Sequence, residues 1–305
     1  CVRQALSDVL VELGKKDPKV LLLTGDHGYA LFDDFRRECP NQYINVGIAE
    51  QNMVGMAAGL ARSGFRPIVY GLSAFVPIRV LEQIKLDVAH DHLPVIFIGD
   101  GAGFVYSHLG TSHQATEDIA CSRVVPNLSV YSPADRFELT QCLAIAYQDN
   151  SAVYLRVGKA DRGDIHQSLP NIKSGRLIKV KTGKESKYSF IATGSMVRTA
   201  IDVADKLHNI DVWSVPFIKP IDRSMVEKIC HNSEAVVVLE EHSKFGGLGS
   251  LIAEIASESS PVKILHVAVN DRFSQKCGTY EYLLQEHELD FATVYKNIRN
   301  FFERI

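Results

Sequence analysis

The feature of this chain that most restricts its fold is the alternation of short β-branched runs with longer amphipathic segments. That pattern is typical of β-α units, in which buried parallel strands are covered by helices. The strand candidates fall into two groups. The first group begins at Val20, Tyr43, Arg66, Pro94, Leu128 and Ala152, and the second at Ser189, Asp211, Ala235 and Val262.

A polar stretch without apolar periodicity, GKADRGDIHQSLPNIKSG from Gly158 to Gly175, separates the two groups. Such stretches commonly join domains, and a chain of 305 residues is long for a single core. The sequence therefore predicts two doubly wound α/β domains. The first, with a mostly parallel sheet, is expected over residues 1–165, and a smaller α/β domain over residues 179–305 follows a linker over residues 166–178.

The composition excludes several classes of protein. Lys and Arg total 33 against 36 Asp and Glu, and no block of like charges offers a surface to nucleic acid. The longest apolar runs, such as PVIFIG, are far shorter than a bilayer requires, so no membrane segment is expected. The six cysteines show no C-x-x-C spacing, which predicts free thiols in a reducing compartment, the cytoplasm by default.

The most informative stretch is VGIAEQNMVGMAAGLARSG over residues 46–64. Gly47 is expected to form a turn after the strand YINV, and a helix is predicted from Glu50 to Arg62. Ligands of open α/β sheets bind at the carboxyl ends of strands, which places Glu50 where chemistry usually occurs. A second interpretation is that Glu50 only stabilises the positive end of the helix dipole. The small residues of this helix also favour a subunit or domain contact.

Two further segments carry candidate residues. A polar loop after the strand PVIFIG contains His108 and His113, and long loops at strand ends are usually functional. The stretch YGLSAFVPI places Phe75 between a strand and a helix, where its ring either stacks on a planar ligand or fills the core. His27 follows a strand end and either faces the same site or is an ordinary hydrogen-bonded histidine.

With these segments in view, the chain resembles the C-terminal half of a transketolase, that is, the pyrimidine-binding domain followed by the small C-terminal domain. The arrangement is similar to that of split transketolases, which are made of two polypeptides. The matching segments run in the family's order along the chain: VGIAEQNMVGMAAGLA, the phenylalanine before RVLEQI, SHQATEDIACSRVVPNLSVYSPAD, YLRVGKA, VVVLEEHSKFGGLGS and DRFSQKCGTYEYLL.

The resemblance implies a transketolase-type transferase that uses thiamine diphosphate to move a two-carbon ketol unit between a ketose and an aldose. In this family a glutamate, matched by Glu50, bonds to the pyrimidine ring and promotes the tautomer that removes the thiazolium proton. Phe75 matches the aromatic residue that stacks on that ring, and Arg79 is assigned to the same cofactor-binding set. His113 matches the histidine that contacts the sugar hydroxyls, so Glu50 and His113 are the candidate catalytic residues.

The resemblance also implies phosphate-binding residues and a partner. Arg156 and Arg3 match arginines that bind the sugar phosphate. The diphosphate-binding half is missing from this sequence, so a partner subunit is expected to hold Mg²⁺ or Ca²⁺ in an α2β2 assembly, with homodimer contacts between copies of this chain. No metal is expected on this chain. GDG at Gly99–Gly101 followed by Asn127 imitates the family's metal motif, but SHQATED between them belongs to the pyrimidine-binding domain.

Departures from the family pattern concern the substrate. Leu109 replaces an aspartate that reads a sugar hydroxyl, and His108 replaces an acidic residue. Asp100 falls near a histidine that contacts phosphate in many members, and an aspartate beside a phosphate is repulsive unless countered. His108 and Asp100 therefore join the candidate substrate-binding residues. Ordinary pentose phosphate interconversion stays open, and the other expected substrate is a specialised sugar whose phosphate is placed differently or is missing.

Other functions stay open. The related β subunits of oxo acid dehydrogenases and deoxyxylulose phosphate synthase decarboxylate a 2-oxo acid with the same coenzyme, and a non-catalytic scaffold is a further alternative. In the second domain, the glycines of EEHSKFGGLGS precede a helix predicted from Leu248 to Ser257. They form either a phosphate cradle or a packing and dimer contact. With the packing interpretation, His242 and His266 are structural.

Overall fold

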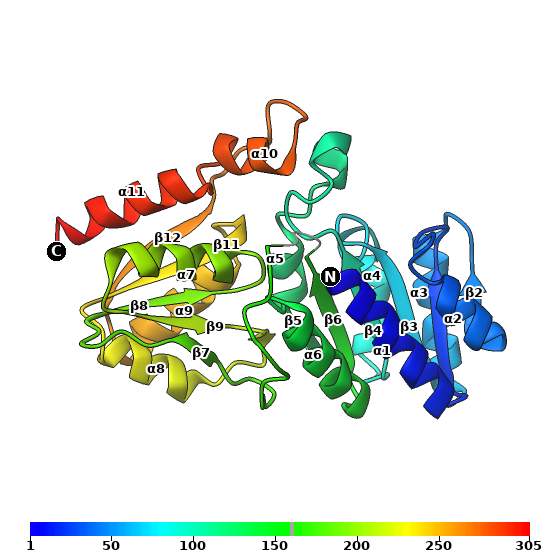
Figure 1. The fold of residues 1–305 in the computed structure, drawn as a ribbon. Helices are drawn as coiled ribbons and strands as arrows, with labels where there is room; N and C mark the ends of the chain where they lie inside the picture. The colour runs from blue at the N-terminus through cyan, green and yellow to red at the C-terminus, as the bar shows by residue number, and fades with distance from the viewer. Residues whose placement is uncertain (159–161) are drawn as a thin grey trace.

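The computed structural model describes residues 1–158 and 162–305 and places two α/β domains side by side (Figure 1). The end of the segment YLRVGKA and part of the predicted boundary region therefore lie outside the described residues. The strands of the first sheet are β1 (Val20–Thr24), β2 (Tyr43–Asn45), β3 (Arg66–Leu72), β4 (Ile96–Asp100), β5 (Leu128–Tyr131), β6 (Ala152–Val157) and β10 (Phe217–Lys219).

The first sheet has the order β10-β5-β6-β4-β3-β1-β2, and every pair is parallel except β10 with β5. Burial of the strands on both faces explains their continuous apolar sequences. Buried side chains from one set of helices pack on one face, and those from a second set pack on the other. The first set comprises α1 (Val2–Lys16), α2 (Asp33–Glu38) and α6 (Arg136–Gln148). The second comprises α3 (Glu50–Arg62), the π-helix Ile84–Ala89 that follows α4 (Leu81–Gln83), and α5 (Asp118–Arg123).

The second sheet has the order β12-β11-β8-β9-β7 and is parallel except for β7 with β9. Its strands are β7 (Ile178–Lys181), β8 (Tyr188–Ala192), β9 (Ile210–Ser214), β11 (Ala235–Ser243) and β12 (Lys263–Val269). Its helices are α7 (Met196–Leu207), α8 (Arg223–His231), α9 (Leu248–Ser259), α10 (Tyr280–Glu286) and α11 (Phe291–Phe302). The prediction of two α/β domains with mostly parallel sheets is confirmed.

Two strands are absent from the predicted set. β7 lies at a sheet edge and is at most half-buried, so its sequence IKVK lacks the apolar run of a central strand. β10 has only three residues, and although it follows the second domain's β9 in sequence, it pairs with β5 of the first. The first sheet therefore includes a strand from beyond the predicted boundary.

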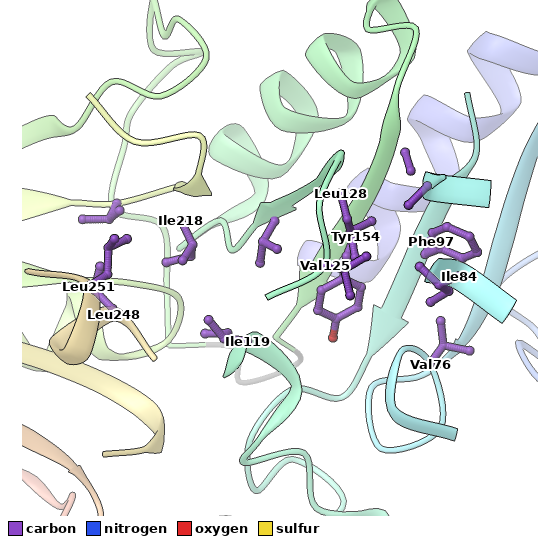
Figure 2. Packing of buried hydrophobic residues seen from close by; sticks show 14 of the residues in the cluster. Val76, Ile84, Phe97, Ile119, Val125, Leu128, Tyr154, Ile218, Leu248 and Leu251 are labelled. Carbon is purple, nitrogen blue, oxygen red and sulfur yellow. The ribbon is translucent and has the colours of Figure 1, made fainter. Parts of the chain in front are cut away.

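One cluster of buried side chains is continuous across both domains. Figure 2 shows Tyr154 and Leu128 of the first domain and Leu248 of the second, with Ile119 and Ile218 between them. The two sheets therefore share apolar packing, and burial of this kind stabilises by roughly 25 cal/mol per Å² removed from water.

Two predictions from composition can be compared with the structure. All six cysteines are free, in agreement with their scattered spacing. Within residues 1–158 and 162–305, no helix combines the length and the apolar character needed to cross a bilayer.

Candidate functional site

The carboxyl ends of neighbouring parallel strands in the first sheet bring the candidate residues together. The loops after β1 and β2 are tied by Asn45, whose Oδ1 accepts hydrogen bonds from the backbone N–H groups of Asp26 and Gly47, each at 3.0 Å. Gly47 has a φ of 74°, which a glycine adopts without strain. This turn directs the chain from β2 into α3 and places Glu50 at the first position of that helix.

Glu50 is buried, with 4% of its surface exposed, although it begins a helix. Its Oε1 accepts a hydrogen bond of 3.0 Å from Nη1 of Arg79, whose side chain is 47% exposed. A residue that merely complemented the helix dipole would remain in water, because that interaction needs no burial. The structure therefore buries Glu50 within the candidate site instead of leaving it on the surface.

Phe75 lies at the centre of this site. The guanidinium carbon of Arg79 is 4.0 Å from the centroid of the Phe75 ring, close enough for a cation–π contact. The ring of His113 packs edge-on at 5.3 Å between centroids, and His27 lies at 6.1 Å. Residues from the segments after β1, β2, β3 and β4 thus meet around one aromatic ring.

His27 also belongs to this group, although the sequence alone left its role undecided. Its Nδ1 is buried and has no hydrogen-bond partner in the described part of the chain. The signal in the sequence was its place just after a strand end, which is where ligands bind in open α/β sheets. A buried, unpartnered ring nitrogen is expected to meet a polar ligand or another chain.

His108 lies on the same loop as His113 but does not join the group around Phe75. It is exposed and lines a cleft of about 600 Å³ together with Cys277, Thr279 and Tyr280 of the second domain. Leu109 beside it is 47% exposed. Of the two residues that depart from the family pattern, His108 therefore borders a cleft shared by the domains.

The assignment of Arg156 to a phosphate site is corrected by the structure. Its side chain is only 3% exposed, and its Nε donates to Oδ2 of the buried Asp118 at 2.7 Å. Its Nη2 donates to the carbonyl oxygens of Ala115 and Glu241. A guanidinium committed to a buried carboxylate and two carbonyls cannot present a donor fork to a substrate. Arg156 instead links the first domain to the second.

Asp100 also requires correction as a substrate-binding residue, because its side chain is fully buried. Its Oδ2 accepts hydrogen bonds from the hydroxyl groups of Tyr70 at 2.7 Å and Tyr106 at 3.1 Å. Nε of Arg3 lies 3.6 Å from the same oxygen. The aspartate is thus countered within the protein. Arg3 keeps 27% of its side chain exposed and borders a cleft of about 460 Å³.

Asp100 and Asn127, the two residues that imitate the family's metal motif, lie in different surroundings. Asp100 is bonded to tyrosines, whereas the side-chain amide of Asn127 donates to the carbonyl of Ala89 at 3.2 Å. Among the residues that the structure describes, no group of three or more His, Cys, Asp or Glu side chains is placed to hold a metal ion.

The glycine loop before α9 does not form a phosphate cradle. The carboxylate of Glu240 is fully buried and accepts hydrogen bonds of 2.8 Å from the backbone N–H groups of Leu248 and Gly249. His266 Nε2 lies 2.7 Å from the same carboxylate, and Nε2 of His242 accepts from the N–H of Ala120. The protein's own anion fills the helix N-terminus, and both histidines have structural contacts.

A two-domain α/β chain that gathers a buried carboxylate, an aromatic ring and histidines at its strand ends has an architecture typical of proteins that bind a small ligand there. The chain belongs to the transketolase family. Residues 1–163 match the family described as "Transketolase, pyrimidine binding domain", and residues 178–294 match "Transketolase, C-terminal domain".

Relatives of similar length carry sugar-specific names. A protein of Phocaeicola vulgatus, named as one subunit of an apulose-4-phosphate transketolase, is 31% identical over 276 residues, covering 87% of this chain and 86% of that protein. "6-deoxy-6-sulfo-D-fructose transketolase subunit SqwH" of Clostridium sp. is 30% identical over 308 residues, covering 99% of this chain and 95% of that protein. A solved structure described as "Split gene transketolase, inactive beta4 tetramer" is 33% identical, covers 98% of this chain and 97% of its own, and superposes with a TM-score of 0.89.

A second group of relatives is longer than this chain. "1-deoxy-D-xylulose-5-phosphate synthase" of Pasteurella multocida is 34% identical over 298 residues, which cover 96% of this chain but 47% of that protein. The chain thus spans about half the length of this relative, whereas it spans most of the split transketolase subunits.

Proposed function

We propose that this chain is the β subunit of a split, thiamine diphosphate-dependent transketolase that moves a two-carbon ketol unit between a ketose and an aldose. The observation that carries the proposal is the contact group formed by Glu50, Arg79 and Phe75. The proposal is also supported by sequence similarity, because the chain matches transketolase subunits with sugar-specific names over most of the length of those subunits.

The residues around Phe75 fit an aminopyrimidine ring. The guanidinium of Arg79 is itself planar and cationic, donates to Glu50 and lies over the Phe75 ring. These are the hydrogen bond and the stacking contact that the family resemblance assigns to the coenzyme's pyrimidine. Because nearly half of the Arg79 side chain is exposed, it can move aside when the ring enters. Glu50 and Phe75 are therefore the proposed cofactor-binding residues, and Arg79 is proposed to occupy both contacts until the ring displaces it.

Each residue has a separate role in the proposed reaction. Bound thiamine diphosphate would supply a carbon that stabilises a carbanion next to the former carbonyl group. Glu50 would hydrogen-bond to the pyrimidine ring and exchange a proton with it, from a buried position from which water is largely excluded. His113 binds the sugar hydroxyls from beside Phe75, and Arg3 and His108 are proposed to contact more distant parts of the sugar.

A partner chain is part of the proposal. The diphosphate and its Mg²⁺ or Ca²⁺ would be held by an N-terminal transketolase subunit, in an α2β2 assembly in the cytoplasm. The outer face of α3 supports contact with another chain, because a Cβ added at Gly55 or Gly59 would meet nothing within 4 Å. Ile48 and Met56 beside them are 79% and 37% exposed. An exposed apolar surface of this kind is typical of subunit contacts.

The proposed substrate is a specialised sugar rather than an ordinary pentose phosphate. Arg156 and Asp118 form a buried pair, and Arg3 lies against Asp100. Within the described residues, each of the two arginines assigned to the sugar phosphate therefore faces a carboxylate, which changes the charge at the family's phosphate position. The relatives named for apulose-4-phosphate and 6-deoxy-6-sulfo-D-fructose are consistent with variation in the anionic group.

The deciding experiment compares the wild-type chain with Glu50→Ala, each reconstituted with its diphosphate-binding partner. We expect ketol transfer to fall by at least about a hundredfold, because general acid–base catalysis contributes that much. Assembly, measured by size-exclusion chromatography, should remain intact. Full activity in the variant would contradict the proposal.

The alternative thiamine function has one specific observation in its favour, the similarity to deoxyxylulose phosphate synthases over 96% of this chain. The same reconstituted enzyme should be supplied with pyruvate and an aldehyde acceptor. Release of carbon dioxide would favour that reaction, and ketol transfer without carbon dioxide would favour transketolase. Absence of both, with the coenzyme bound, would indicate a non-catalytic scaffold.

A further inference from the structure

The loop between β4 and α5, which carries His108 and His113, is held at both ends by the second domain. Near its start, the N–H of Phe104 donates to Oε1 of Glu241 at 2.7 Å, and the Phe104 ring stacks on His287 with centroids 4.6 Å apart. Glu241 also accepts a hydrogen bond of 2.5 Å from the hydroxyl of Tyr280. Phe104, Glu241 and His287 are buried and Tyr280 is half-buried, so these contacts are largely shielded from water.

The far end of the loop is held through Gln114, the residue directly after His113. The Gln114 side chain is buried, and its Oε1 accepts a hydrogen bond of 2.9 Å from Oγ of Ser274. The Ser274 Oγ lies 2.8 Å from Nε2 of His287. A serine hydroxyl has a single proton, which here goes to Gln114, so His287 Nε2 must donate to Ser274.

The surroundings of His287 agree with this arrangement of protons. Its Nδ1 is buried and makes no hydrogen bond within the described residues, as expected for the nitrogen without a proton. Burial, together with the nearby charge of Arg272, lowers the pKa of His287 below its usual value. The imidazole is therefore neutral near pH 7, with its one N–H directed to Ser274.

The loop itself is poorly suited to hold His113 in place. Gly101, Gly103 and Gly110 all have positive φ angles, between 63° and 82°. Glycines at such angles leave the unconstrained chain many alternative conformations. The backbone bridge between Gly103 and Ala115 closes the loop, and contacts from outside it add to this restraint. Reacting groups must be held closely, because a misplacement of about 1 Å can cost a hundredfold in rate.

We propose that Ser274 and His287 of the second domain are positioning residues that fix His113 through Gln114. This inference rests on the proposed function for its effect on activity, but the geometry itself can be tested separately. The second domain then contributes to the reaction without touching substrate or coenzyme. The alternative is that these contacts only join the two domains.

The test compares Ser274→Ala with Ser233→Ala in the enzyme reconstituted with its partner. Ser233 is a suitable control, because its half-buried hydroxyl bonds only within the second domain, to Ile229 and Ser189. We expect Ser274→Ala to lower kcat/KM for the ketose about ten- to a hundredfold. The dissociation constant of thiamine diphosphate should stay within about twofold, and Ser274→Thr should recover most of the activity because it keeps the hydroxyl.

A second measurement does not depend on the reaction. The ring resonances of His113, identified in a histidine-labelled chain by their loss in His113→Ala, should shift or broaden in Ser274→Ala and stay in place in Ser233→Ala. If the wild type lacks ketol transfer, the proposed function fails, and these resonances still decide the positioning. Unchanged His113 resonances in a folded Ser274→Ala chain, or equal losses of activity in both variants, would overturn the inference. If Ser274→Ala does not fold, the same comparison is made with Ser274→Cys.

Discussion

At the scale of single residues, Arg79 contacts both Glu50 and Phe75 in the proposed coenzyme site. Its guanidinium donates to Glu50 at 3.0 Å and lies 4.0 Å from the centre of the Phe75 ring. A planar coenzyme ring that takes over both contacts must displace this side chain. The ion pair therefore stabilises the protein without the coenzyme and opposes binding of the coenzyme by a similar amount, because the two states compete for Glu50.

We predict opposite effects of Arg79→Ala on stability and on binding. Without the coenzyme, the variant should unfold at a lower temperature, because Glu50 loses its partner while it stays buried. Thiamine diphosphate should bind about two- to tenfold more tightly to the reconstituted variant, since a half-exposed ion pair is worth about 1 kcal/mol. Calorimetric titration and thermal unfolding measure the two quantities. Weaker binding would show that Arg79 remains a ligand of the coenzyme.

At the scale of secondary structure, the carboxylate of Glu240 stabilises the N-terminus of α9. It occupies the position that an external anion could otherwise take. Burial alone raises the pKa of a carboxyl group, but the hydrogen bond from His266, the charge of His242 and the backbone N–H of Gly249 hold the pKa of Glu240 below its usual value. A Cβ added at Gly247 would clash with Oε2 of Glu240, so the turn must be glycine for the carboxylate to fit. The sequence EEHSKFGGLGS is thus a structural helix start.

We expect Glu240→Gln to destabilise the chain at pH 7 by about 1.5–3 kcal/mol, the usual contribution of hydrogen bonds to a charged group. Because the pKa of Glu240 is depressed in the folded state, the stabilisation is present above the unfolded pKa of about 4.5 and is lost as pH falls below it. Urea unfolding should show a smaller difference in the free energy of unfolding between wild type and variant at pH 4 than at pH 7. A difference that is larger at pH 4 would contradict this account.

At the scale of the whole molecule, the two domains are less separate than the sequence suggests. β10 pairs with β5 across the boundary, Arg156 donates to the carbonyl of Glu241, and one apolar cluster runs through both sheets (Figure 2). The loop of His113 is held by the second domain as well. The second domain therefore supports the candidate site as well as packing against the first domain.

A fragment of residues 1–165 should consequently be unstable, although it contains every strand predicted for the first domain. It lacks β10, so β5 becomes an open sheet edge, and it exposes the apolar surface that faces α9. We expect aggregation, or a thermal midpoint well below that of the full chain, measured by light scattering and calorimetry. A fragment as stable as the full chain would show that the shared core contributes little.

Much of the architecture and part of the site follow from the sequence alone. Continuous apolar runs and amphipathic runs of period 3.6 depend on neighbouring residues only, so the central strands and the helix from Glu50 to Arg62 were predictable. The position of Glu50 and Phe75 after strand ends also predicted that they would lie close together, because parallel strands align their carboxyl ends. Short edge strands such as β7 and β10 carry no comparable signal.

Only the tertiary structure decided which charged side chains are accessible to a ligand. Arg156 and Asp100 follow strands as Glu50 does, yet they are buried against Asp118 and against Tyr70 and Tyr106. Those partners are 6 to 38 residues away in sequence, and local patterns cannot reveal contacts made by folding. For the same reason the link from Ser274 to Gln114, which spans 160 residues, emerged only from the fold. The sequence determined where chemistry is placed, and packing determined which side chains can take part.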